Sequence, residues 1–287
     1  MYFEKKYRQA VWVISLAVAV AMFALIIINR QYVPEYPYLI PLEMKVNYAI
    51  TIAILVAITP SAVIEYSNNR WLKQVDENIP RLLTDLAESI RSGMPLVRAL
   101  EEATKRDYGP VTGILETAVV NFNLTSDLEG SLRWFGEKLL RPNGKRLATI
   151  LMEAYNSGGR MMDILETSIQ MFTSVDEYRE DKQANIGPYV LLFYVSNLIF
   201  LFIGWVVVDQ FLTPLSQQNI NTPGVASLIG NMLSINYYKA IIYWAAIVEG
   251  IVGGLVAGKL INSRVLSGLF HSVILTVITY QFFIFFV

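Results

Sequence analysis

A long polar stretch lies between two strongly apolar blocks of this 287-residue chain. Apolar runs occupy Gln9–Ile28 and Tyr48–Ile64 before it, and Pro188–Val208, Tyr238–Leu260 and Val265–Val287 after it. Each run approaches the ~20 residues that an α-helix needs to cross ~30 Å of hydrocarbon. The sequence therefore predicts about five transmembrane helices, with a polar domain inserted between the second and the third.

The composition fits a membrane protein and excludes several kinds of chemistry. Hydrophobic residues make up 54% of the chain, above the roughly 45–50% of a soluble domain. The lack of cysteine excludes a disulfide and a thiolate nucleophile, and a single histidine with scattered carboxylates does not suffice for a metal site. The net charge of −1 gives no indication of nucleic-acid binding. We expect no metal, cofactor, catalytic residue or nucleic-acid partner.

Lysine and arginine residues predict the orientation in the membrane. Three precede the first apolar run, fifteen lie in the polar stretch, and two lie in the turn between the fourth and fifth runs. Because cytoplasmic loops are enriched in these residues, we predict a cytoplasmic N-terminus and an outer C-terminus. The expected parts are a transmembrane hairpin (residues 1–65), a cytoplasmic helical domain (residues 66–185) and a three-span transmembrane block (residues 186–287).

Hydrophobic periodicity in the polar stretch predicts six helices. Gly93 is expected to end the first of them and Pro95 to begin the second, because glycine is common just after a helix and proline at its start. Ser126 opens a capping box for the fourth helix, and the turn at Gly158 and Gly159 ends the fifth. Short connections and one apolar face per helix predict a compact bundle. The predicted fold class is therefore an all-α integral membrane protein.

Four segments of this polar domain form an ordered pattern. They are Ile79–Gly93, Pro95–Glu101, Leu128–Leu132 and Glu153–Leu165. The first ends on a glycine, and the last contains a glycine turn before a helix. The pattern resembles the F domain of type II secretion systems, which occurs in platform proteins of type IV pili, archaella and tight-adherence machines.

Two further segments, Gly254–Lys259 and Gly268–Ser272, resemble the archaeal branch of the same family. The resemblance implies a non-enzymatic platform in the inner membrane, surrounded by membrane lipid. Such a platform gathers pilin subunits and docks a cytoplasmic hexameric assembly ATPase. The chain contains no GxxxxGK[ST] phosphate-binding loop, so the energy is expected to come from that ATPase. Many relatives carry two F domains, whereas one is recognised here, which implies a homodimer or pairing with a sister F-domain chain.

Glu249 and His271 are the ionisable residues that stand out inside the predicted spans. Counted from the cytoplasmic turn, their depths differ by about 5 Å, so we expect that they can face each other. Three interpretations stay open. The pair forms an interhelical hydrogen bond that fixes the packing, or it grips a pilin transmembrane helix, for instance at its N-terminal amine, or it relays protons.

Two other groups of residues have a structural and a functional interpretation. Gly250, Gly254 and Gly258 form a ridge that lets helices approach closely, either within the chain or against a dimer partner or a pilin. A basic group in the helical domain is either a solvated face or a docking surface for the ATPase. Its members are Arg141, Lys145, Arg146 and Arg160.

The main alternative function is a polytopic transporter or channel subunit that uses Glu249 and His271 as a polar pathway. The spans show no obvious inverted repeat, and this alternative leaves the helical domain unexplained. An intramembrane aspartic peptidase needs two close carboxylates, whereas the spans supply only Glu249, with Asp209 at a boundary.

Overall fold

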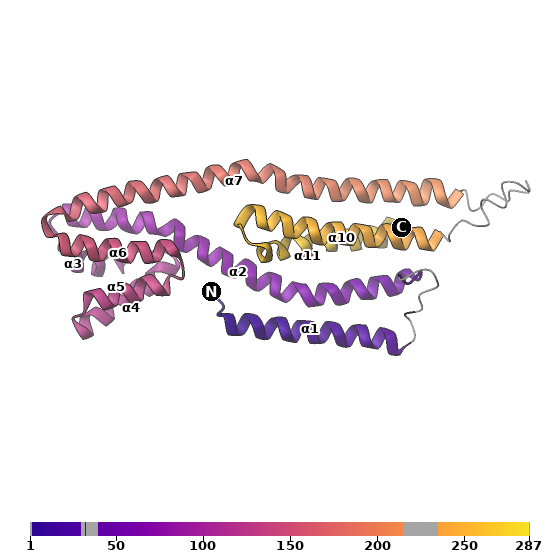
Figure 1. Ribbon diagram of the computed structural model, residues 1–287, viewed down its shortest axis with the longest axis horizontal. Helices are drawn as coiled ribbons and strands as arrows, with labels where there is room; N and C mark the ends of the chain where they lie inside the picture. The colour runs from indigo at the N-terminus through magenta and orange to yellow at the C-terminus, as the bar shows by residue number, and fades with distance from the viewer. Residues whose placement is uncertain (1, 30–31, 33–39, 215–234, 287) are drawn as a thin grey trace, which may run out of the picture. The chain divides into compact units, whose positions relative to one another are not determined.

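The computed structural model describes residues 2–29, 32, 40–214 and 235–286, and every regular element within these ranges is helical (Figure 1). The long helices are α1 (Lys5–Ile28), α2 (Met44–Arg91), α7 (Met161–Trp205), α10 (Ile235–Asn262) and α11 (Leu269–Phe286). The shorter helices are α3 (Leu96–Ala103), α4 (Pro110–Thr125), α5 (Leu128–Lys138) and α6 (Pro142–Ser157). Single turns are η1 (Gly158–Arg160) and η3 (Val265–Gly268), and the π-helical segment η2 (Val206–Leu212) follows α7.

Five helical segments are long and apolar enough to cross a membrane. They contain the five apolar runs found in the sequence, although the last residue of the fifth run, Val287, lies outside the described residues. Their surfaces carry large apolar side chains that face outward, such as Val13 and Leu16 on α1 and Leu191 on α7. Exposed apolar surface of this extent is typical of a membrane contact. The predicted all-α class and the five helices that are long and apolar enough to cross a membrane are confirmed.

The chain divides into two compact units. Residues 67–184 belong to one unit, which we call the helical domain, and residues 3–66 and 185–287 belong to the other, the membrane unit. The N-terminal hairpin and the C-terminal spans therefore share one unit. Helices α2 and α7 each contribute residues to both units.

The helical domain is organised around one aliphatic core. The α2 part supplies Ile79, Leu82, Leu83 and Leu86, which are all fully buried and recur at helical spacing. The remaining helices of the domain each add apolar residues to the same core cluster. Leu115, Phe135, Leu147, Leu151 and Leu165 are among them. The apolar residues that recur every three or four positions in the sequence are thus residues of this core.

Glycine residues end two helices of this domain, α2 and α6. Gly93 has φ +96°, and its N–H donates to the Ile90 carbonyl while the Met94 N–H donates to that of Ser89. Glycine adopts this left-handed conformation without strain, which explains why α2 ends here. Gly158, with φ +54°, ends α6, and Gly159 lies in η1.

The cap of α5 differs from the prediction. Asp127, rather than Ser126, is the N-cap residue, and its Oδ1 accepts a 2.8 Å hydrogen bond from the Gly130 N–H. Ser126 instead has a left-handed backbone with φ 55° and ends α4. Two residues separate α4 from α5, and because Ser126 serves as the C-cap of α4, the carboxylate of Asp127 takes the N-cap role for α5.

Polar side chains join the helices of the membrane unit. Trp244 Nε1 donates to Asn47 Oδ1 (2.9 Å), and Tyr243 Oη donates to Thr51 Oγ1 (2.6 Å). Tyr48 Oη donates to the backbone carbonyl of Phe283 (3.1 Å). One stretch of α2 is thereby bonded to both α10 and α11. At another point of α2, Glu65 forms an ion pair with Arg8 of α1.

Candidate functional site

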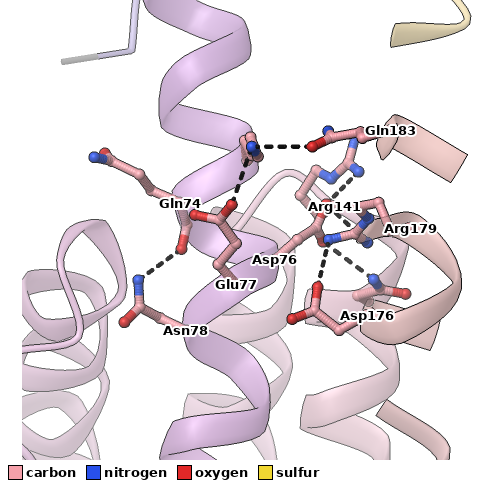
Figure 2. Close-up of polar contacts among 10 residues, drawn as sticks. Gln74, Asp76, Glu77, Asn78, Arg141, Asp176, Arg179 and Gln183 are labelled. Atoms are coloured by element: carbon pink, nitrogen blue, oxygen red, sulfur yellow. Dashed lines mark hydrogen bonds and ion pairs between the residues drawn. The ribbon is translucent and has the colours of Figure 1, made fainter. Parts of the chain in front are cut away.

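A buried carboxylate joins three parts of the helical domain (Figure 2). The side chain of Asp76 on α2 is only 1% exposed and forms an ion pair with Arg141, the residue that precedes α6. Asn143 Nδ2 donates to Asp76 Oδ1 (3.1 Å). Arg179 on α7 approaches the other oxygen of Asp76 (3.6 Å) and also pairs with Asp176 (3.3 Å). We call these five residues the Asp76 cluster.

The Asp76 cluster balances two carboxylates with two guanidinium groups. Burial raises the pKa of Asp176, and nearby Glu180, Glu77 and Asp76 raise it further, while Arg179 acts in the opposite direction. Removing one partner of a buried ion pair leaves an uncompensated charge, which is strongly destabilising. Arg141 was predicted as a docking residue. In the structure it neutralises Asp76, with 29% of its side chain exposed.

The other predicted docking residues are exposed and lie in two places. Lys145 and Arg146 lie in the first turns of α6, close in sequence to Arg141, whereas Arg160 follows the far end of this helix. The length of α6 separates the two places by about 20 Å. None of these three side chains forms an ion pair with another residue that the structure describes. The structure therefore does not gather all four basic residues, and their docking role stays a prediction.

A second polar constellation in the domain was not found from the sequence. Tyr108 Oη donates to Asp85 Oδ2 (2.6 Å), and the Arg106 guanidinium is 2.9 Å from the same oxygen. The Arg81 guanidinium lies 5.8 Å from the centre of the Tyr108 ring. The buried tyrosine thus fastens the connection between α3 and α4 to α2. The sequence feature that could have indicated this contact is an aromatic residue, Tyr108, directly before Gly109 and Pro110 at the start of α4.

The charges of this constellation depend on one another. Burial raises the pKa of Asp85, but hydrogen bonds from Tyr108 and Arg106 and the charges of Arg106 and Arg81 outweigh it and hold the pKa below its usual value. Burial and the bond to Asp85 raise the pKa of Tyr108. At neutral pH the tyrosine therefore stays a donor and the aspartate an acceptor.

In the membrane unit, Glu249 and His271 have separate partners on α7. Ser196 Oγ donates to Glu249 Oε1 (2.9 Å). The Tyr194 hydroxyl lies 2.7 Å from His271 Nδ1. No hydrogen bond joins Glu249 to His271 in the described part of the chain. Glu249 Oε2 is buried and has no partner among the described residues.

The glycine ridge of α10 faces η3 and α11, which lie beside it (Figure 1). A Cβ added at Gly254 would clash with the backbone of Ser272, and one at Gly258 with that of Gly268. A Cβ at Gly250 would lie 3.3 Å from Leu275 Cβ. Hydroxyl groups bond across the same contact, because Ser267 Oγ donates to the Gly258 carbonyl and Ser272 Oγ to that of Ile251, each at 2.8 Å. All three glycines therefore lie against a helix of the same chain.

The described residues contain no group of three or more histidine, aspartate or glutamate side chains arranged to hold a metal ion. The features that distinguish the chain are instead five apolar helices and a helical domain inserted between the second and the third of them. These features define a multi-pass membrane protein with an inserted helical domain.

Comparison with known proteins narrows this class. Residues 82–208 match the family described as type II secretion system (T2SS), protein F. This segment is therefore similar to the protein F family, which confirms the resemblance seen in the sequence. The matched segment starts within α2 and ends within η2.

One relative is an uncharacterized protein of Methanocaldococcus jannaschii. The two proteins are 26% identical over 241 residues, which cover 82% of this chain and 38% of the relative. The chain thus spans well under half of the relative's length. No solved structure matches the chain.

Proposed function

We propose that this chain is a non-enzymatic membrane platform for the assembly of a type IV pilus-like filament. In this role the membrane unit passes pilin subunits from the bilayer into the filament, and the helical domain docks a cytoplasmic assembly ATPase. The observation that carries the proposal is the match of residues 82–208 to a secretion-system family, in a chain with five membrane-length helices.

The proposed orientation places the N-terminus and the helical domain in the cytoplasm and the C-terminus outside. The distribution of lysine and arginine supports it, because fifteen of the 23 basic residues lie in the polar stretch. The six helical segments of the domain then form one cytoplasmic bundle that an ATPase can reach. Lys145 and Arg146 are exposed and unpaired in the described structure, so they are available for a contact with acidic side chains.

The proposed mechanism uses movement generated by the partner. The chain has no phosphate-binding loop of its own, so the ATPase supplies the work. Helices α2 and α7 each have residues in the helical domain and in the membrane unit, which offers a covalent route for displacement into the bilayer. A second copy, or a sister chain with an F domain, completes the platform.

A deletion experiment tests this function. Cells that lack the gene are expected to lose one class of surface filament in electron micrographs while they retain processed pilin in the membrane. Expression of the intact chain should restore the filaments. Filaments that persist at wild-type number in the deletion strain, with solute flux through the purified chain in liposomes, would instead favour a transporter that uses Glu249 and His271.

A further inference from the structure

Glu249 has an unsatisfied oxygen in the membrane unit. Its Oε1 accepts the hydrogen bond from Ser196, but its buried Oε2 has no partner in the part of the chain that the structure describes. Carboxylates inside hydrocarbon are costly and usually pair with a second polar group. The local structure therefore satisfies only half of this carboxylate.

The depth of Glu249 limits what can approach it. The residue lies ten positions before Lys259 at the end of α10, which corresponds to about 15 Å of helix. This is about half of the ~30 Å hydrocarbon layer. Lipid headgroups stay at the two surfaces of this layer, so they do not reach Glu249. A polar group at this depth has to be carried there by another transmembrane helix.

The surface beside Glu249 is an open apolar groove of about 570 Å³. Apart from Glu249, its walls are Ile40 and residues that follow one face of α10, namely Ile241, Trp244, Ala245, Val248 and Val252. Val248 and Val252 are more than half exposed, so no helix of the described chain covers this face. The small Ala245 leaves room for a close approach between helices. The bond from Trp244 to Asn47 fixes one wall.

We propose that this groove binds a transmembrane helix of a partner chain that carries one amine group at mid-membrane depth. The amine pairs with the carboxylate of Glu249, whose side chain lines the groove, and the apolar side chains around it pack against Val248 and Val252. Charge complementarity selects the amine, because the groove offers a carboxylate and otherwise only apolar surface. The inference rests on the proposed function for the identity of this partner as a filament subunit.

Peptide binding to the full chain in nanodiscs tests the proposal. The probe is a fluorescent transmembrane peptide of leucine and alanine with one central lysine, and the matched control peptide has leucine at that position. Wild-type protein should bind the lysine peptide about tenfold more tightly, as expected of a charge pair shielded from water. In Glu249→Leu the two peptides should bind equally. Equal binding to the wild type, or a preference that survives in Glu249→Leu, would overturn the proposal.

Two further variants distinguish a specific loss of peptide binding at the groove from a general loss of folding. Glu249→Gln keeps an acceptor for Ser196, so it should retain the wild-type unfolding temperature while its preference for the lysine peptide falls several-fold. Ala245→Trp leaves the carboxylate in place but fills the groove, and should weaken the binding of both peptides. Undiminished binding to Ala245→Trp would contradict the groove as the site. None of these readouts uses the ATPase or filaments, so a failure here leaves the proposed function to its own test.

Discussion

The largest fully buried side chains of the helical domain are mostly leucine and isoleucine with Tyr108 and Phe135, whereas α10 and α11 of the membrane unit meet through glycine and serine. In the domain, apolar side chains leave water, and this drives the packing. In a bilayer, lipid tails are as apolar as leucine, so close backbone approach and hydrogen bonds between helices have to supply the specificity.

Charged side chains follow the same division. The helical domain buries Asp76, which pairs with Arg141 and Arg179 from other segments, and partly buries Asp85, which pairs with Arg106. The helices of the membrane unit are joined mainly by hydroxyl and amide groups, as in the bonds of Asn47 and Thr51, with one ion pair between Arg8 and Glu65. Different substitutions are therefore expected to destabilise the two units.

The largest effect is expected at the Asp76 cluster. Arg141→Ala leaves Asp76 with the neutral Asn143 amide and only the longer contact to the Arg179 guanidinium, and should lower the free energy of unfolding of the full chain by about 3 kcal/mol. The control is Arg133→Ala, which removes an exposed pair with Glu129 and should cost less than about 1 kcal/mol. Thermal unfolding of both variants in detergent measures the difference. Equal effects would show that the Asp76 cluster does not stabilise the domain.

The second-largest loss of stability is expected from a substitution at Gly258, in the close contact between α10 and η3. Gly258→Ala pushes a Cβ into the backbone of Gly268 and should destabilise the unit by about 2 kcal/mol through overpacking. Gly187→Ala is the matched control, because a Cβ there meets nothing within 4 Å. The unfolding temperature in nanodiscs compares the two. A control that loses as much stability as Gly258→Ala would contradict the close α10 contact.

A smaller effect is expected at the second charge constellation. Tyr108→Phe keeps the buried ring but removes the donor to Asp85, and should cost about 1.5 kcal/mol. Tyr155→Phe, at an exposed position of α6, should change little. Chemical denaturation of the full chain reports both values. A Tyr108→Phe variant as stable as the wild type would show that the hydroxyl bond contributes nothing.

The smallest expected effect is on pH dependence. Because the folded protein lowers the pKa of Asp85, this group contributes stability above its unfolded pKa of about 3.9, and the contribution is lost as the pH falls through the lower folded value. The stability gap between wild type and Tyr108→Phe should therefore narrow in acid. Unfolding measured at pH values from 6 down to 3 follows the gap. A stability difference between the two proteins that widens in acid would contradict the lowered pKa of Asp85.

Local patterns in the sequence predicted the helices and several of their ends. They could not predict contacts between residues that are far apart in the sequence. The apolar runs and the glycine at position 93 depend only on neighbouring residues, so the five spans and the end of α2 could be read directly. The α5 cap was misplaced by one residue because Ser126 and Asp127 both suit a cap. Asp76 and Arg179 are distant in sequence, so no spacing rule pairs them. The partners of Glu249 and His271 on α7 were missed for the same reason.

The most direct test of the platform function is binding of the hexameric secretion ATPase from the same genome to the full chain in nanodiscs. We expect a complex that weakens with salt, because exposed charges are screened. Reversing the charges at Lys145 and Arg146 together should weaken it about tenfold. An ATPase that does not bind at low salt, or that binds the charge-reversed chain as tightly as the wild type, would contradict the proposed platform function.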